Sequence, residues 1–138
     1  MSQLQYSPLR SISLPMAAGA VIEPGDGVCL NASAFAVPAA EAPALKTIGK
    51  AVHRGADNTG GANGDVRVVV YRSGPEGFAY ANSTGADEIG NEHLGLPCYW
   101  AGPRTVALTD GEGARSPAGY VAKLEGGAVF VEHPIAMD

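Results

Sequence analysis

The sequence predicts an all-β fold: a small β-barrel or sandwich of short antiparallel strands, with at most one or two helical turns and an extended N-terminal arm. The chain of 138 residues contains 19 glycines and 10 prolines without a collagen-like period, so regular elements must be short and separated by turns. Segments with the spacing of strands recur between these turns. An apolar content of 46% indicates a folded chain, and the length suits one domain.

The clearest strand follows a glycine-rich loop in the middle of the chain. The loop, Asp57 to Asp65, concentrates glycine, asparagine and aspartate, which favour positive φ and Asx turns. After it, Val68 and Val70 fall on one face of an extended segment and Arg67 on the other, the pattern of a half-buried strand. The nearest apolar segments on either side are expected to pair with this strand. Residues 48–81 would then form a meander at the centre of one sheet.

Three hairpins and several turns are predicted around this centre. Pro24 followed by Gly25 has the signature of a type II turn. Asn91 is expected to cap a short helical turn that runs through Leu94 and ends at Gly95. The expected hairpins pair residues 28–30 with 35–37, 97–100 with 105–108, and 118–124 with 128–132.

Residues 1–16 are predicted to form an extended arm that precedes a single β-barrel-like domain over residues 17–138. Pro8 and Pro15 prevent a continuous helix, and no turn folds the segment back before residues 17–19. The alternative is that the segment is the first strand of the domain's own sheet. As an arm, it is expected to become ordered against a partner. The side chains that would make this contact are Leu4, Tyr6, Leu9, Arg10, Ile12 and Leu14.

Charge and hydrophobicity exclude some classes of function. The net charge of −5 and the lack of a basic stripe argue against nucleic-acid binding. No apolar run reaches the roughly 18 residues of a membrane span, and the N-terminus lacks the pattern of a signal peptide. We therefore expect the chain to stay in the cytoplasm where it is made, with Cys29 and Cys98 as buried thiols.

No motif assigns a catalytic residue, a cofactor or a metal ligand. The sequence contains neither a Gly-x-Ser-x-Gly motif nor a phosphate-binding loop that ends in lysine. Oxygen ligands in the Asp57–Asp65 loop do not have a known calcium-loop spacing, and the three histidines are isolated in sequence. The alternative class of function is a small β-barrel enzyme or a ligand- or metal-binding domain that uses His93, Cys98 and the acidic loops.

A set of segments shares its order and spacing with a known family. The segments are Ile48–Ala51, the Asp57–Asp65 loop, Arg67–Val70, Phe78–Asn82, Gly95–Tyr99, Thr105–Ala107 with Thr109–Gly111, and Ala118–Val121. Together they resemble the capsid cement, or head decoration, proteins of tailed bacteriophages and prophages. The likeness extends over about residues 17–133 and does not include the first sixteen residues.

The resemblance implies a virion structural protein without enzymatic activity or cofactor. Such a protein binds the outer surface of the assembled head and stabilises it, so its localisation would be the outer capsid surface of the virion. Its partners would be the major capsid protein and further copies of itself, with a homotrimer preferred over a dimer. The arm formed by residues 1–16 would reach over neighbouring capsid subunits, and many attached copies would add avidity.

Overall fold

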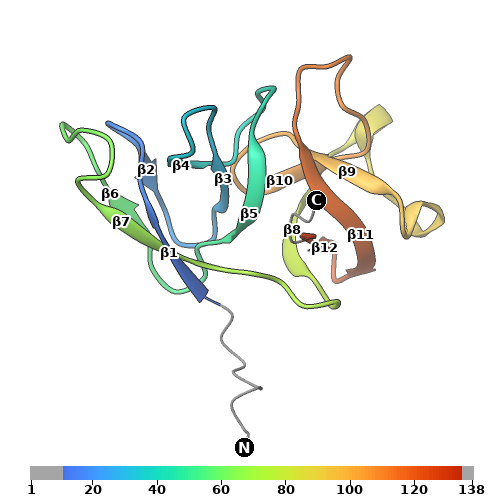
Figure 1. Ribbon diagram of the computed structural model, residues 1–138. Helices are drawn as coiled ribbons and strands as arrows, with labels where there is room; N and C mark the ends of the chain where they lie inside the picture. The colour runs from blue at the N-terminus through green and yellow to red at the C-terminus, as the bar shows by residue number, and fades with distance from the viewer. Residues whose placement is uncertain (1–10, 135–138) are drawn as a thin grey trace, which may run out of the picture.

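The computed structural model describes residues 11–134 and confirms an all-β fold. Figure 1 shows two groups of strands lying side by side. We call residues 11–74 the sheet half and residues 75–134 the barrel half. The sheet half contains a five-stranded sheet and a separate pair of short strands, whereas the barrel half is a closed barrel of five strands.

The strands are short, as the density of glycine and proline predicts. The sheet half contains β1 (Ser11–Pro15), β2 (Val21–Ile22), β3 (Gly27–Leu30), β4 (Ala36–Pro38), β5 (Lys46–Lys50), β6 (Ala56–Asp57) and β7 (Arg67–Tyr71). The barrel half contains β8 (Phe78–Asn82), the 3-10 helical turns η2 (Gly85–Asp87) and η3 (Asn91–His93), β9 (Pro97–Trp100), β10 (Thr105–Ala107), β11 (Pro117–Glu125) and β12 (Ala128–Glu132).

The five-stranded sheet has the strand order β1-β7-β5-β3-β4 and curls so that its two edges meet. A parallel bridge between Met16, just after β1, and Ala36 of β4 connects these edges. Inside lies a core cluster that includes Val68 and Val70, which are fully buried, while Arg67 is exposed. The predicted alternation along β7 is therefore confirmed.

The barrel has the strand order β10-β8-β12-β11-β9, and its pairs are antiparallel except for β10 with β8. Its core cluster is built around Trp100, which has no exposed surface. Tyr80 stands edge-on to Trp100, with 4.9 Å between the ring centroids, a favourable geometry for aromatic pairs.

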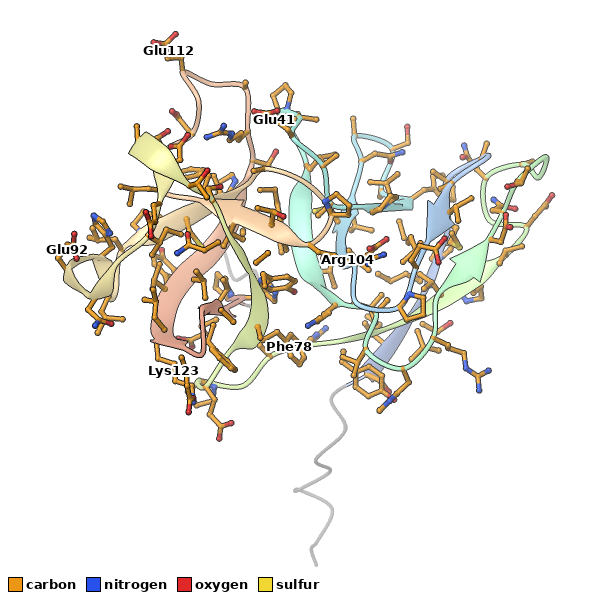
Figure 2. All side chains as sticks on the ribbon, turned by 180° about the vertical axis from the view of Figure 1, so that it is seen from behind. Glu41, Phe78, Glu92, Arg104, Glu112 and Lys123 are labelled. Carbon is orange, nitrogen blue, oxygen red and sulfur yellow. The ribbon has the colours of Figure 1, made fainter. Side chains whose placement is uncertain are left out.

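Strands β3 and β5 join the two halves. The Trp100 ring lies against Gly27 so closely that a Cβ on this glycine would overlap the ring. The indole N–H donates a 2.7 Å hydrogen bond to Thr47 Oγ1 of β5. Next to them, Arg104 Nε donates to the buried Asp26 carboxylate at 2.8 Å, and Figure 2 shows Arg104 between the two halves.

The meander predicted over residues 48–81 is wrong. β7 pairs with β1 along its whole length and with β5 through a single residue pair, whereas β8 belongs to the barrel and pairs with β12 and β10. The chain leaves the sheet half between β7 and β8. At Gly77, where φ is +81°, it runs so close to the backbone of Val131 that a side chain would not fit.

The boundary of the arm at residue 16 is also wrong, because Ser11–Pro15 is strand β1. Its register with β7 runs from Ser11 opposite Tyr71 to Pro15 opposite Arg67. Ile12 and Leu14 pack against the core of the sheet half, so these two side chains are not available to a partner. The alternative interpretation, a first strand of the domain's own sheet, is correct for this stretch.

The three predicted hairpins are confirmed. β3 pairs with β4, β9 with β10, and β11 with β12, all antiparallel. In the last hairpin, Gly126 and Gly127 both have positive φ, at 62° and 84°. This conformation matches the twist of the two strands and is accessible to glycine at little cost.

Helical structure within residues 11–134 is limited to the two turns η2 and η3. The second turn occurs where it was predicted and is followed by Gly95 at a φ of +83°. Its N-cap is Gly90 and not Asn91, which already belongs to the turn. Over the same residues, no helix has the length and apolar character needed to cross a membrane.

Candidate functional site

A buried histidine, His133, follows β12 in the barrel half. Its Nδ1 lies 2.7 Å from the carbonyl oxygen of Ala118, and its Nε2 lies 2.7 Å from the hydroxyl of Tyr80. A carbonyl oxygen only accepts, so Nδ1 carries the proton and, in the neutral ring, Nε2 accepts the bond that the Tyr80 hydroxyl donates. Both ring nitrogens are thereby satisfied inside the core.

His133 is held in its neutral form. The pKa of His133 is lowered from 6.5 to about 4, mainly by burial and to a smaller extent by the nearby Lys50 ammonium, although the hydrogen bond to Ala118 partly opposes this shift. Burial also raises the pKa of Tyr80 well above its ordinary value of 10. The pair therefore stays uncharged at neutral pH and links β8, β11 and β12 through hydrogen bonds.

We expect the neutral His133 to make folding sensitive to mild acid. Below pH 6.5 the unfolded chain binds a proton at this residue that the folded chain does not bind until about pH 4. The free energy of unfolding should fall as the pH drops from 7 towards 4, by about 3 kcal/mol in total. Denaturant unfolding at pH 7 and pH 5 measures this. His133→Gln should lose most of the pH dependence in this range, whereas the exposed His53→Gln should keep it; an unchanged slope in His133→Gln would contradict the assignment.

The two cysteines are core residues, as predicted. Cys29 and Cys98 have no exposed surface and lie in the same core cluster as Trp100. Burial raises the pKa of each thiol to about 12, although a hydrogen-bond contact with Thr47 partly opposes this for Cys29. At neutral pH both thiols are protonated, and protonated thiols are poor nucleophiles and poor metal ligands.

The structure does not bring together the residues of the alternative site. His93 lies on η3, where its Nδ1 accepts the backbone N–H of Gly90, while Cys98 points into the barrel core. Among residues 11–134, no group of three or more His, Cys, Asp and Glu side chains is placed to hold a metal ion.

The Asp57–Asp65 loop uses its polar side chains to hold its own shape. Asn58 is buried and donates from Nδ2 to the carbonyl oxygens of Ala17 and Ala62. The two carboxylates accept backbone N–H groups within the loop, from Thr59 and Ala62 respectively. Gly60 and Gly64 have φ values of 77° and 84°, which confirms the predicted positive-φ positions. These contacts define a structural turn.

The proposed arm residues fall into two groups. Ile12 and Leu14 belong to β1 and pack inward, as described above. Leu4, Tyr6, Leu9 and Arg10 lie outside the described residues.

The structure shows an exposed apolar surface that the sequence did not single out. It is centred on Tyr120 of β11, whose relative exposure is 47%, and Tyr120 lies directly opposite the exposed Pro97 of β9. Leu94 and Leu96, at 49% and 46%, adjoin it because their turn forms backbone hydrogen bonds with Val121. These four large exposed side chains, which we call the Tyr120 surface, lie on one side of the barrel.

A groove of about 370 Å³ continues the Tyr120 surface towards the sheet half. It lies where β5 passes β9 and β11, and its floor includes the buried Ala118 and Gly119. Its walls are formed by Leu45, Lys46, Thr47, Pro97, Tyr99, Pro117, Tyr120 and Pro134. Aromatic and proline side chains around a preformed groove are typical of a surface that binds another protein.

Comparisons of the chain with protein-family models, curated proteins and solved structures gave no match. By its architecture, the protein is an all-β chain in which a curled sheet packs against a closed barrel.

Proposed function

We propose that this protein decorates the heads of a tailed bacteriophage: it binds the outer surface of the assembled capsid through the Tyr120 surface and stabilises it. The proposal combines the family resemblance of residues 17–133 with one structural observation, the cluster of exposed apolar side chains around Tyr120. The major capsid protein is the proposed partner, together with further copies of this chain in a homotrimer. No catalytic step is part of the proposal.

The Tyr120 surface has the properties of a binding site for a repeated protein surface. Tyr120 offers a large apolar area with a polar hydroxyl, a combination enriched among residues that dominate binding energy. Its backbone is fixed between β9 and β12, so little conformational entropy is lost on binding. Each contact can be weak, because linked copies on a shell bind with high avidity.

Residues 1–10 form the second proposed contact with the capsid. They precede β1, whose first residue, Ser11, is exposed at the end of the β1–β7 pair. From there, the apolar side chains of Leu4, Tyr6 and Leu9 and the charge of Arg10 would extend the buried area. This proposal replaces the longer arm of residues 1–16.

Cosedimentation with capsids tests the attachment. The probe is tailed-phage heads produced from the genome that encodes this chain, stripped of their own decoration. We expect the double variant Leu96→Ser/Tyr120→Ser to bind these heads roughly 30-fold more weakly, the loss expected for removing an interface hot spot. Both side chains are exposed, so thermal unfolding should change little.

A matched control is Val21→Ser on β2, because Val21 is also exposed, at 37%, but lies in the sheet half. This variant should bind capsids like the unmodified protein. Equal binding by Leu96→Ser/Tyr120→Ser and Val21→Ser would show that the Tyr120 surface is not the attachment site. Failure of the unmodified protein to bind would overturn the proposed function itself.

A further inference from the structure

The two halves of the chain differ strongly in charge. Residues 75–134 contain eight Asp and Glu but three Lys and Arg, a net charge of −5 with His neutral, whereas residues 11–74 contain five of each. Seven of the eight acidic side chains in the barrel half are exposed. Figure 2 shows Glu92 and Glu112 projecting from the barrel half, on the side away from β7.

The outer face of β7 carries an unpartnered basic and aromatic surface. Its hollow, of about 380 Å³, is lined by His53, Arg54, Val69 and Tyr71. Arg54 is exposed and forms no ion pair with any residue in the range 11–134. Val69 is 39% exposed although it lies in the middle of a strand.

Arg67 extends this basic face along the same side of β7. Its guanidinium donates from Nε to Ser13 Oγ and from Nη2 to the Ser13 carbonyl oxygen, both at 2.9 Å, which fixes it beside the hollow. No carboxylate of residues 11–134 pairs with it. An aromatic and aliphatic centre bordered by arginines is the usual composition of a protein interface.

The barrel half offers the complementary surface. Glu88, after η2, and Glu125, at the β11–β12 turn, line one hollow of about 690 Å³. The turn itself is exposed over Glu125, Gly126 and Gly127, and the Glu125 carboxylate pairs with Lys123 Nζ at 3.0 Å. Glu88 is exposed and forms no ion pair with any residue in the range 11–134, so Glu88 is the carboxylate that we place opposite Arg54.

We infer that the β7 face of one copy binds the acidic surface around Glu88 in the barrel half of a second copy, head to tail. The two surfaces belong to different halves of the chain. In an assembly of identical copies, each copy can bind one neighbour through its β7 face and another through its acidic surface. Such a head-to-tail contact closes a ring when it repeats with a suitable rotation. The inference rests on the proposed self-association but not on capsid binding.

Sedimentation velocity of the purified full chain tests this contact without any capsid. Self-association should be stronger at about 50 mM than at about 500 mM NaCl, because salt screens charge complementarity. Arg54→Glu and Glu88→Arg should each weaken association by on the order of tenfold or more, because each places like charges opposite one another. The double variant Arg54→Glu/Glu88→Arg should restore most of it, because the charges are exchanged across the same contact.

The matched control is Glu76→Arg, which makes the same change in charge as Glu88→Arg at an exposed position between β7 and β8. It should associate at least as strongly as the unmodified chain. The inference would be overturned if the unmodified chain stayed monomeric at both salt concentrations or if the single variants associated normally. It would also be overturned if the double variant associated no more strongly than the single variants.

Rings that form but do not bind capsids would instead overturn the proposed function, and the contact between copies would remain supported.

Discussion

Val68→Asp is expected to abolish cooperative folding of the protein. Val68 is 1% exposed and lies in the core of the sheet half, on a strand flanked by β1 and β5. An ionised carboxylate there would have no cation or hydrogen-bond donor to compensate its desolvation, at a cost of several kcal/mol against a typical total stability of about 5–15 kcal/mol. Circular dichroism and thermal unfolding measure the effect.

Val69→Asp is the control for this prediction. Val69 is the next residue of the same strand, and it faces solvent. Its replacement introduces the same charge with almost the same change in β propensity, so its thermal unfolding should stay cooperative and shift by a few degrees. If Val68→Asp also melts cooperatively near the unmodified protein, the assignment of the inner face of β7 is wrong.

Removing residues 1–16 should destabilise the fold far more than removing residues 1–10. The longer deletion removes β1 and the fully buried Met16, and it leaves the backbone of β7 without its partner along its whole length. Losing the buried parts of Ile12, Leu14 and Met16 alone costs on the order of 5 kcal/mol, at about 1.5–3 kcal/mol for each fully buried side chain. The shorter deletion leaves this strand in place.

Thermal unfolding of both truncated chains checks this prediction. The chain that starts at Ser11 should melt within a few degrees of the full chain, and the chain that starts at Ala17 should melt many degrees lower or fail to fold. Similar melting of the two would mean that β1 contributes little to the sheet. The capsid affinity of the shorter deletion then measures what residues 1–10 add to attachment, without a change in fold.

Local patterns were sufficient to predict most strands and turns. The alternation of Val68 and Val70 with Arg67 is sufficient to predict strand β7 and its buried face. The glycine pair between β11 and β12 is likewise sufficient to predict the turn of that hairpin. Ser11 to Leu14 has the same alternation, with Ile12 and Leu14 inward, and this signal would have identified β1. Pro8 and Pro15 exclude a continuous helix, and for this reason the prediction favoured an extended arm over a strand. Pro15, however, is compatible with the end of an edge strand.

Strand partners and surfaces depend on contacts between distant residues, and local patterns do not contain them. β8 follows β7 in the chain, yet it pairs with β12, about fifty residues later, because the connection crosses between the halves at Gly77. The exposed position of Tyr120 follows from a register shift between β9 and β11, which places Tyr120 opposite Pro97. In the sequence, Tyr120 is indistinguishable from a core aromatic such as Tyr80.

A density map of the phage particle from electron cryomicroscopy tests the central proposal most directly. The account predicts a density of this protein's size and two-part shape, repeated at equivalent positions on the outer surface of the head, with the side of the barrel that carries Tyr120 against the major capsid protein. A head whose outer surface lacks this density, although the chain is present in the purified particle, would contradict it.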